Sequence, residues 1–332
     1  MKKPDIPKTR SAFTLIELIF VIIILGVVSS IGSSIIANVY KNYLLQRATH
    51  RASLKTELAA QQIANLLSYR IQLPITSTTI ARNPNDFTDN VFVTDPTLAS
   101  DNLHTLLEWI ATDNDGFSAA LLPPWNGFCD IDASSQASIR TPGSQLTLEN
   151  TILSNLSNSE VSLNGTQHPA IFFRHSLYKE TASPPPKTDY YRVLDDPDGT
   201  PGCMGMISND TSCISTVSIV DNENLSFQNS AGVANKVIAE HYKVAWTAYS
   251  IWQVDDDGDG LYDLKLCYNY QPWEGERLSS NGCPGTLSTI ITNVSVFKFA
   301  ESGNTFRFKL CSQENIGEDY NISICKEKAI IL

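Results

Sequence analysis

The sequence lacks the common signatures of catalysis. Its 332 residues contain no HExxH, GxSxG, Walker or GxGxxG motif, and its five histidines are scattered. These absences remove the usual signatures of zinc proteases, hydrolases and nucleotide-binding proteins. Serine, histidine and aspartate could still converge in space, because a catalytic triad is defined by geometry. From the residues alone we expect a protein without enzymatic activity.

Basic residues are also scarce. The chain has 24 Lys and Arg against 35 Asp and Glu, a formal net charge of −11. Phosphate backbones bind basic surfaces, so nucleic acid is not expected as a partner. The seven cysteines form no CxxC pair. This disfavours a zinc ribbon or a thioredoxin-like site and fits an oxidising compartment.

One long apolar run lies in the first forty residues. Between Glu17 and Lys41 stand 23 residues without a charge. As a helix they extend roughly 35 Å, enough to cross a hydrocarbon core of about 30 Å. The run is longer than the apolar region of a cleaved signal peptide, about 7–15 residues. Its centre, Ile22–Leu25, would be apolar on every face of a helix. We therefore predict a membrane span over residues 13–40.

Charge alone does not orient this span. Four basic residues precede it and four follow it within its near flank, a tie under the positive-inside rule. All seven cysteines follow the span and are expected in an oxidising compartment. We therefore predict a single-pass protein with a cytoplasmic N-terminus and an outward-facing soluble head.

An acidic residue stands at the start of the apolar run. A carboxylate inside a membrane helix costs about 2.5–3.5 kcal/mol at the centre and less near the edge. Glu17 is thus a functional candidate, the alternative being that it snorkels to the headgroups. It is preceded by a short basic leader, Ser11-Ala12 and the string Phe13-Thr14-Leu15-Ile16. Together these residues resemble the leader and cleavage junction of a type IV prepilin.

The resemblance implies processing and assembly. In that family a membrane prepilin peptidase removes the leader, here residues 1–12, and methylates the new amine. The cut would fall between Ala12 and Phe13, although most members have glycine where Ala12 stands. Glu17 would be the fifth mature residue and would pair with the N-terminal amine of a neighbouring subunit. The implied partners are other pilins or pseudopilins, the prepilin peptidase, an inner-membrane assembly platform and membrane lipid.

The apolar pattern continues through residues 41–74. Small and aliphatic residues recur at steps of three and four, and no Gly or Pro interrupts them before Pro74. We therefore predict one helix from Phe13 to about Leu73, roughly 90 Å long. An ordinary amphipathic helix after an anchor is the alternative. With the resemblance, the pattern implies a lollipop-shaped α+β subunit whose long helix packs on an antiparallel sheet.

Residues 75–187 carry weak periodicity and are interpreted as an irregular, insert-rich part of the head. Within them, residues 102–112 are expected to form a short helix. Residues 75–100 and 132–165 are expected to be irregular. Consecutive prolines in residues 183–187 favour an extended linker.

Residues 188–332 are predicted to form the β-rich part of the head. Aromatic and β-branched residues alternate in part along several short runs, which is typical of strands. The predicted strands cover residues 243–254, 261–270, 290–299 and 305–311.

Seven cysteines cannot all pair within one chain, and the sequence leaves many connectivities open. Metal ligation is the alternative, but no Cys/His cluster has zinc spacing. Local spacing suggests Cys203–Cys213, Cys267–Cys283 and Cys311–Cys325, with Cys129 left over. The last pair is similar to the disulfide-bounded C-terminal loop of many pilins.

An acidic loop fits the pattern D-x-D-x-D-G-x-x-D. Alternate oxygen ligands can surround a hard cation, and Gly260 permits the sharp turn. Closely held carboxylates repel each other unless a cation neutralises them, so we predict calcium as a cofactor. The predicted ligands are the side chains of Asp255, Asp257, Asp259 and Asp263 and the carbonyl of Leu261.

The acidic loop is not an EF-hand. Its last ligand position holds Leu266 in place of a bidentate glutamate, and its flanks are strand-like. It resembles the calcium hairpin of integrin-type propeller blades, and a solvated Asp-Gly turn is the alternative. Shorter Asp-Gly strings at residues 113–116 and 195–199 are expected to be plain turns.

These features together predict a minor pilin or pseudopilin. It would be a non-enzymatic subunit of a type IV pilus or a type II secretion pseudopilus, held first in the inner membrane with a periplasmic head. The rival prediction, from another functional class, is a membrane-anchored extracytoplasmic calcium-binding adhesin or enzyme that does not assemble.

Overall fold

The structure is a computed structural model. It describes residues 14–71, 75–79, 90–93, 95, 98, 104–135, 137–179, 205–206, 211, 214–228, 238–302, 305–316 and 320–331, with only the backbone described for 174–179 and 320. The chain divides into two compact units. One comprises Met1–Ala52 with Glu314–Ile322, and the other comprises Ser53–Gln313 with Ser323–Leu332.

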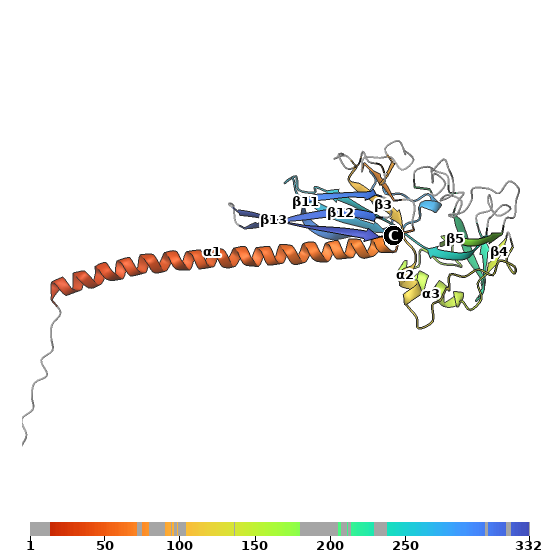
Figure 1. Cartoon of the computed structure of the whole chain (residues 1–332), viewed down its shortest axis with the longest axis horizontal. Coiled ribbons are helices and arrows are strands. Elements are labelled where there is room, and N and C mark those ends of the chain that lie inside the picture. Colours follow the sequence, from red (N-terminus) through yellow and green to blue (C-terminus); the bar gives the residue numbers. More distant parts are fainter. Residues whose placement is uncertain are drawn as a thin grey trace, which may run out of the picture. The chain divides into compact units, whose positions relative to one another are not determined.

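The described chain starts with one continuous helix, α1 (Leu15–Ser68), drawn in red and orange in Figure 1. Aliphatic side chains along its first half are exposed on all sides. Among the described residues, α1 is the one helix long and apolar enough to cross a membrane. A helix that is hydrophobic all round is stable in lipid or against other apolar surfaces. The predicted span is therefore a helix whose apolar surface is uncovered.

The helix ends at Ser68, a few residues before the predicted end. Arg70 then forms an antiparallel bridge with Ala111. The main-chain N–H of Ile71 donates to the carbonyl of Ile110 at 2.9 Å. The chain thus leaves the helix by pairing with a strand, and this pairing ends the helix before Pro74 is reached.

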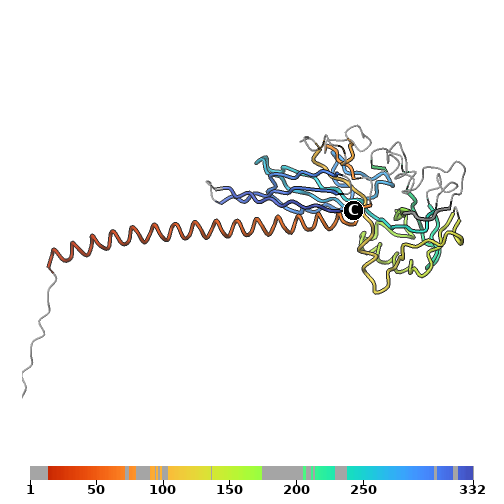
Figure 2. Tube along the Cα trace, in the orientation of Figure 1, coloured from red at the N-terminus to blue at the C-terminus, as the bar shows by residue number. Residues whose placement is uncertain are grey.

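An eight-stranded antiparallel sheet forms the larger part of the head, in the order β13-β12-β11-β10-β9-β3-β1-β2. Figure 2 shows how early segments, in orange, and late segments, in blue, join in this sheet. The strands are β1 (Thr76–Thr78), β2 (Val91–Phe92), β3 (Leu106–Ile110), β9 (Ala248–Val254), β10 (Tyr262–Tyr268), β11 (Thr286–Ser302), β12 (Thr305–Ile316) and β13 (Tyr320–Ile331).

The second half of α1 packs on this sheet through one stripe of residues. Ala59, Ile63 and Leu67 are buried in a single core with aromatic residues of β11 and β12. Two lysines of β13 also contact the helix: Lys328 Nζ lies 2.6 Å and Lys326 Nζ 3.3 Å from the carboxylate of Glu57. The prediction of an α+β fold with a long helix on an antiparallel sheet is confirmed.

A second sheet has five strands in the order β4-β7-β6-β5-β8. One hydrophobic core contains residues of both sheets, among them Phe172 of the smaller sheet and Trp252 of the larger. A separate core includes Trp125, Leu153 and Tyr242. The elements are β4 (Ser138–Arg140), β5 (Ala170–Lys179), β6 (Ser215–Asp221), β7 (Asn224–Phe227), β8 (Ile238–Ala245), α2 (Asn114–Ser118), α3 (Leu146–Leu156) and the 3₁₀ turn η4 (Pro272–Glu274).

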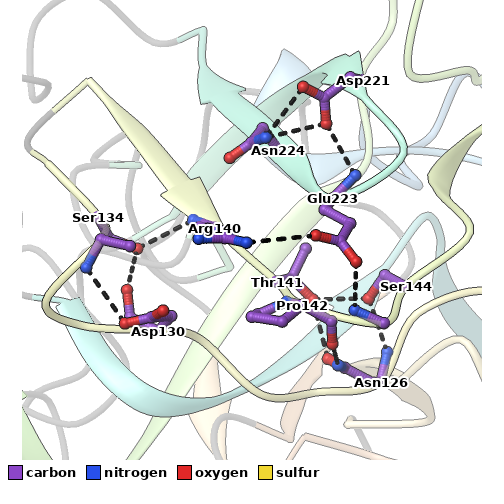
Figure 3. A network of polar contacts seen from close by, with 12 residues as sticks. Asn126, Asp130, Ser134, Arg140, Thr141, Pro142, Ser144, Asp221, Glu223 and Asn224 are labelled. Carbon is purple, nitrogen blue, oxygen red and sulfur yellow. Dashed lines mark hydrogen bonds and ion pairs between the residues drawn. The ribbon is translucent and has the colours of Figure 1, made fainter.

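A polar network holds the edge of the smaller sheet (Figure 3). Arg140 Nη2 lies 3.7 Å from one oxygen of Glu223, and the other oxygen accepts from the N–H of Gly143 at 2.8 Å. Thr141 Oγ1 donates to the amide oxygen of Asn126 at 2.8 Å. The Arg140–Glu223 pair is half-exposed and contributes little by itself. Together these contacts fix the loop beside β4 against the β6–β7 turn.

Two interpretations within residues 75–187 are wrong. Residues 102–112 contain the strand β3 instead of a helix, and all five residues of β3 are buried. A short apolar run buried on both faces has no two-residue alternation, so periodicity alone cannot separate it from a helix. Residues 132–165 are not irregular, because they contain β4 and α3. The predicted linker, residues 183–187, lies outside the described residues.

The four predicted strands are present with altered limits. Residues 243–254 belong to two strands, because the chain passes from β8 to β9 at Trp246-Thr247. The other three correspond to β10, β11 and β12, of which β11 and β12 are longer than predicted. The last strand, β13, was not predicted, although residues 322–330 alternate in burial.

The packing stripe of α1 can be tested with two identical substitutions. Leu67→Ala removes a fully buried side chain and should lower the free energy of unfolding by about 2–5 kcal/mol. Leu58→Ala removes a side chain that is 70 % exposed and should change it by about 0.5 kcal/mol or less. Denaturant unfolding of the full chain in detergent measures both. Equal losses would contradict this packing face.

Candidate functional site

The start of α1 carries the residues predicted for processing and assembly. Ala12 and Phe13 lie outside the described residues. Thr14 and Glu17 are described and exposed, and they bind each other. The N–H and the hydroxyl of Thr14 each donate to Glu17 Oε2 at 3.0 Å, and the N–H of Glu17 donates to Thr14 Oγ1 at 3.4 Å. This reciprocal arrangement is a capping box.

The capping box fixes where the Glu17 carboxylate lies. Its negative charge sits at the positive end of the helix dipole, where it is stabilised. Its second oxygen, Oε1, accepts no hydrogen bond from the described residues. A carboxylate offers about four acceptor positions, so this group can still accept bonds from a cationic donor.

The acidic loop joins β9 to β10 and is exposed throughout residues 255–260. Carboxylate oxygens of Asp255, Asp257 and Asp259 lie within 4.8 Å of one another. The loop holds its own shape, since Asp255 accepts from the N–H of Gly258 at 2.7 Å and of Gly260 at 3.3 Å. Both glycines have positive φ, at 74° and 82°, which L side chains rarely adopt.

The group of three does not include Asp263. Asp263 lies in β10, and its Oδ2 accepts from Lys265 Nζ at 3.0 Å. The same ammonium lies 3.3 Å from Asp256, and the hydrogen bond to Asp263 is the main reason that the pKa of Lys265 is raised. The N–H of Leu261 donates to Asp259 at 2.8 Å. Three carboxylates suit a hard cation such as calcium, whereas Asp263 is paired with Lys265.

Two of the three predicted disulfides fall among the described residues, and both are present. Each closes a short segment of the β-rich head, with Cα atoms 5.7 Å and 4.0 Å apart respectively. The chain-entropy view attributes about 3 kcal/mol of stabilisation to closing a loop of this length. The bonds are Cys267–Cys283 and Cys311–Cys325. Cys203 and Cys213 lie outside the described residues.

Cys129 has a free thiol, as predicted for the left-over cysteine. It is fully buried, and its sulfur lies 3.4 Å from Ser134 Oγ. Burial raises the pKa of the Cys129 thiol to about 11. The reactive thiolate is therefore rare at neutral pH, and the residue acts as a small apolar side chain.

A buried carboxyl pair was not predicted. Asp113 caps α2, because its Oδ1 accepts from the N–H of Gly116 at 2.9 Å, while its Oδ2 accepts from the indole of Trp125 at 3.1 Å. Glu149 of α3 is 1 % exposed, and neither of its oxygens accepts a hydrogen bond from the described residues.

Glu149 keeps its proton in the folded state. Burial raises the pKa of Glu149 to about 10, and the charge of Asp113 adds to the rise. Glu149 is therefore neutral near pH 7. The sequence marks Asp113 only as the start of an Asp-Gly turn, and no local pattern marks Glu149.

The N-terminal segment is where the chain is similar to known proteins. Residues 7–33 match the family described as the prokaryotic N-terminal methylation motif. This is a type IV prepilin-like cleavage and methylation segment, so the resemblance seen in the sequence is confirmed. The match includes the capping box and much of the apolar half of α1. No curated protein and no solved structure matches the chain significantly.

The motif and the helix together support a coarse description. The chain carries the anchor of a type IV pilin-like or pseudopilin-like protein. Its one apolar helix fits a single-pass membrane anchor. Such a motif is typical of structural subunits of the pilin type.

The raised pKa of Glu149 leads to a prediction about how the stability of the protein depends on pH. The folded state holds the Glu149 proton up to about pH 10, whereas the unfolded chain releases it near 4.5. The contribution of this group to stability is therefore complete below pH 4.5 and falls as the pH rises towards 10. The slope is at most about 1.4 kcal/mol per pH unit. Glu149→Gln has no carboxyl proton to release and should remove the contribution of this group to the slope of stability against pH.

Thermal unfolding of the full chain between pH 5 and 9 measures the effect. Asp132→Asn, at an exposed carboxylate, is the control and should keep the slope of the unaltered chain. A Glu149→Gln variant with that same slope would show that Glu149 is ionised in the folded state.

Proposed function

We propose that this chain is a minor pilin or pseudopilin, a non-enzymatic subunit of a type IV pilus or type II secretion pseudopilus. The observation that carries the proposal is the methylation motif at residues 7–33. Two further features support it. The first half of α1 exposes apolar side chains on every face, and the second half is built into a folded head.

Assembly requires more than apolar contact. Lipid tails are as apolar as leucine, so moving the first half of α1 from lipid to neighbouring helices gains little hydrophobic free energy. A polar pair inside the apolar bundle gives a larger difference in free energy between the correct and incorrect helix registers than apolar contacts give. Glu17 is the acidic residue of this segment, and the capping box holds its carboxylate at the helix start. Glu17 therefore sets the register by pairing with the amine of a neighbouring subunit.

The amine comes from processing. A prepilin peptidase cuts between Ala12 and Phe13, and the new N-terminus of Phe13 lies one residue before the capping box. Before assembly the protein is held in the inner membrane, with the N-terminus cytoplasmic and the head periplasmic. Its partners are the peptidase, an assembly platform, other pilins or pseudopilins, and lipid. The two disulfides support an oxidising location for the head.

Removing the carboxylate tests the register role. Glu17→Ala should leave the protein in the membrane and lower its incorporation into sheared filaments at least tenfold, equivalent to about 1.4 kcal/mol. Thr14→Ala is the control: it removes the hydroxyl cap, worth about 1 kcal/mol, but keeps the carboxylate, so incorporation should persist.

Mass spectrometry should find a methylated Phe13 at the mature N-terminus of both variants. If the processed Glu17→Ala protein is incorporated into filaments as well as the unaltered chain, Glu17 does not set the register. A native chain that starts at Met1 and stays in the membrane would favour an anchored adhesin or enzyme that does not assemble.

We also propose that the acidic loop binds calcium through Asp255, Asp257 and Asp259. The support is the closeness of their carboxylate oxygens and the loop's D-x-D-x-D-G pattern. Asp263 and the carbonyl of Leu261 would join the ligands if the ion displaced Lys265. Binding would relieve the repulsion between three exposed carboxylates and brace the β9–β10 turn.

Calcium should raise the melting temperature of the full chain, and a chelator should reverse the rise. At calcium a hundredfold above Kd, the stabilisation is about 2.7 kcal/mol. Asp257→Asn should abolish the response. Asp256→Asn is the matched control, since Asp256 pairs with Lys265 outside the group and its loss should leave the response intact. If calcium does not change the melting temperature, the proposal that the acidic loop binds calcium is wrong.

A further inference from the structure

The head contains a cavity of about 340 Å³ that the proposed function does not use. It opens between the end of α1, the connection from β3 to α2, and the turn from β8 to β9. Its volume falls within the usual range of ligand sites, about 300–1,000 Å³. Its walls include Tyr69, Asp113, Asp115, Trp246, Thr247 and Tyr249.

Hydrogen bonds hold the walls in place. The carbonyl of Tyr69 accepts from both the N–H and the hydroxyl of Thr112, at 2.8 and 2.9 Å. In the β8–β9 turn, Thr247 Oγ1 donates to the carbonyl of Ala248 and accepts from the N–H of Asn269, each at 2.7 Å. A cavity with fixed walls needs little ordering when a ligand enters.

Aromatic rings form one side of the cavity. Tyr249 stacks on Trp109 with ring centroids 5.7 Å apart and on Tyr268 at 6.4 Å. Trp246 is buried beside it, whereas Tyr69 is 45 % exposed. The fixed position of Tyr249 and the exposure of Tyr69 place one aromatic wall inside the cavity and one at its rim.

Two aspartates line the cavity. Both carboxylate oxygens of Asp113 accept hydrogen bonds, and Asp115 is exposed and accepts no hydrogen bond from the described residues. None of the lining residues is a lysine, arginine or histidine. Lys243 of β8 lies instead over the ring of Trp125, which is not a lining residue. Burial raises the pKa of Tyr249, and the charges of Asp115 and Asp113 add to it, so both carboxylates act at this wall.

We propose that this cavity binds a compact organic cation, an alkylammonium or guanidinium group. Aromatic rings attract such groups through their negative faces, by about 0.5–2 kcal/mol each. A carboxylate adds a charge-assisted hydrogen bond. The two aspartates would repel an anion. A neutral alkyl group would make neither the cation–π interaction nor the charge-assisted hydrogen bond. The cation can be a free amine or the side chain of a lysine or arginine on another protein.

Calorimetric titration of the full chain in detergent tests the proposal. Butylammonium and butylguanidinium should bind, and butanol and butyrate should bind at least tenfold more weakly. Asp115→Asn and Tyr69→Ala should each weaken butylammonium at least fivefold, whereas Tyr69→Phe should keep the affinity. Asp132→Asn, at an exposed carboxylate outside the cavity and the acidic loop, is the control for diffuse charge and should change nothing. The melting temperature of each variant shows whether it is folded.

A lysine peptide, acetyl-Gly-Lys-Gly-amide, identifies the source of the cation. Binding as tight as that of butylammonium or tighter supports a protein side chain, and weaker binding supports a free amine. Absence of cation binding by the folded chain would overturn the proposal. So would equal binding of butanol, or an affinity that neither Asp115→Asn nor Tyr69→Ala changes. None of these outcomes depends on filament assembly, so the site and the proposed function can fail separately.

Discussion

The structure depends on one constraint, that the first half of α1 cannot face water. Burying a single leucine or isoleucine is worth about 1.5–3 kcal/mol, and this segment exposes such side chains on every face, from Leu15 to Tyr43. The second half of the same helix meets a different requirement, because the sheet covers its one apolar stripe. One continuous helix therefore serves two environments, and the change between them occurs without a break in its hydrogen bonding.

Polar groups on α1 follow the same division. In the apolar half, the Glu17 carboxylate accepts hydrogen bonds from Thr14 at the start of the same helix. Part of the hydrogen-bonding capacity of this carboxylate is therefore satisfied within the isolated helix. In the half that packs on the sheet, Glu57 bonds to two lysines of β13 instead. Glu17 has one carboxylate oxygen that accepts no hydrogen bond from the described residues, whereas Glu57 belongs to the fold of the head. The Glu17 carboxylate can therefore accept a further bond from another group, whereas both oxygens of Glu57 are already paired with lysines.

The sequence predicted a feature correctly where the residues of one short segment are enough to indicate it. The span, the capping string around Glu17 and the alternating strands β10 and β12 are local patterns, and closely spaced cysteines pair because their loops are short. It failed where the partner is remote. The strand β3 is buried on both faces because a core lies on each side, and Glu149 stays neutral because the fold buries it. Asp263 alternates like a strand residue, and its contact with Lys265 depends on the pleat of β10.

The disulfide between Cys267 and Cys283 has a consequence for the stability of the head. It ties the segment that carries Trp273 and Leu278 to β10, and both side chains belong to the core shared by the two sheets. In the reducing cytosol this segment would lack its covalent anchor, and the shared core would be less firmly closed. Reduction of this one bond would therefore free the segment between β10 and β11 and loosen the core that joins the two sheets.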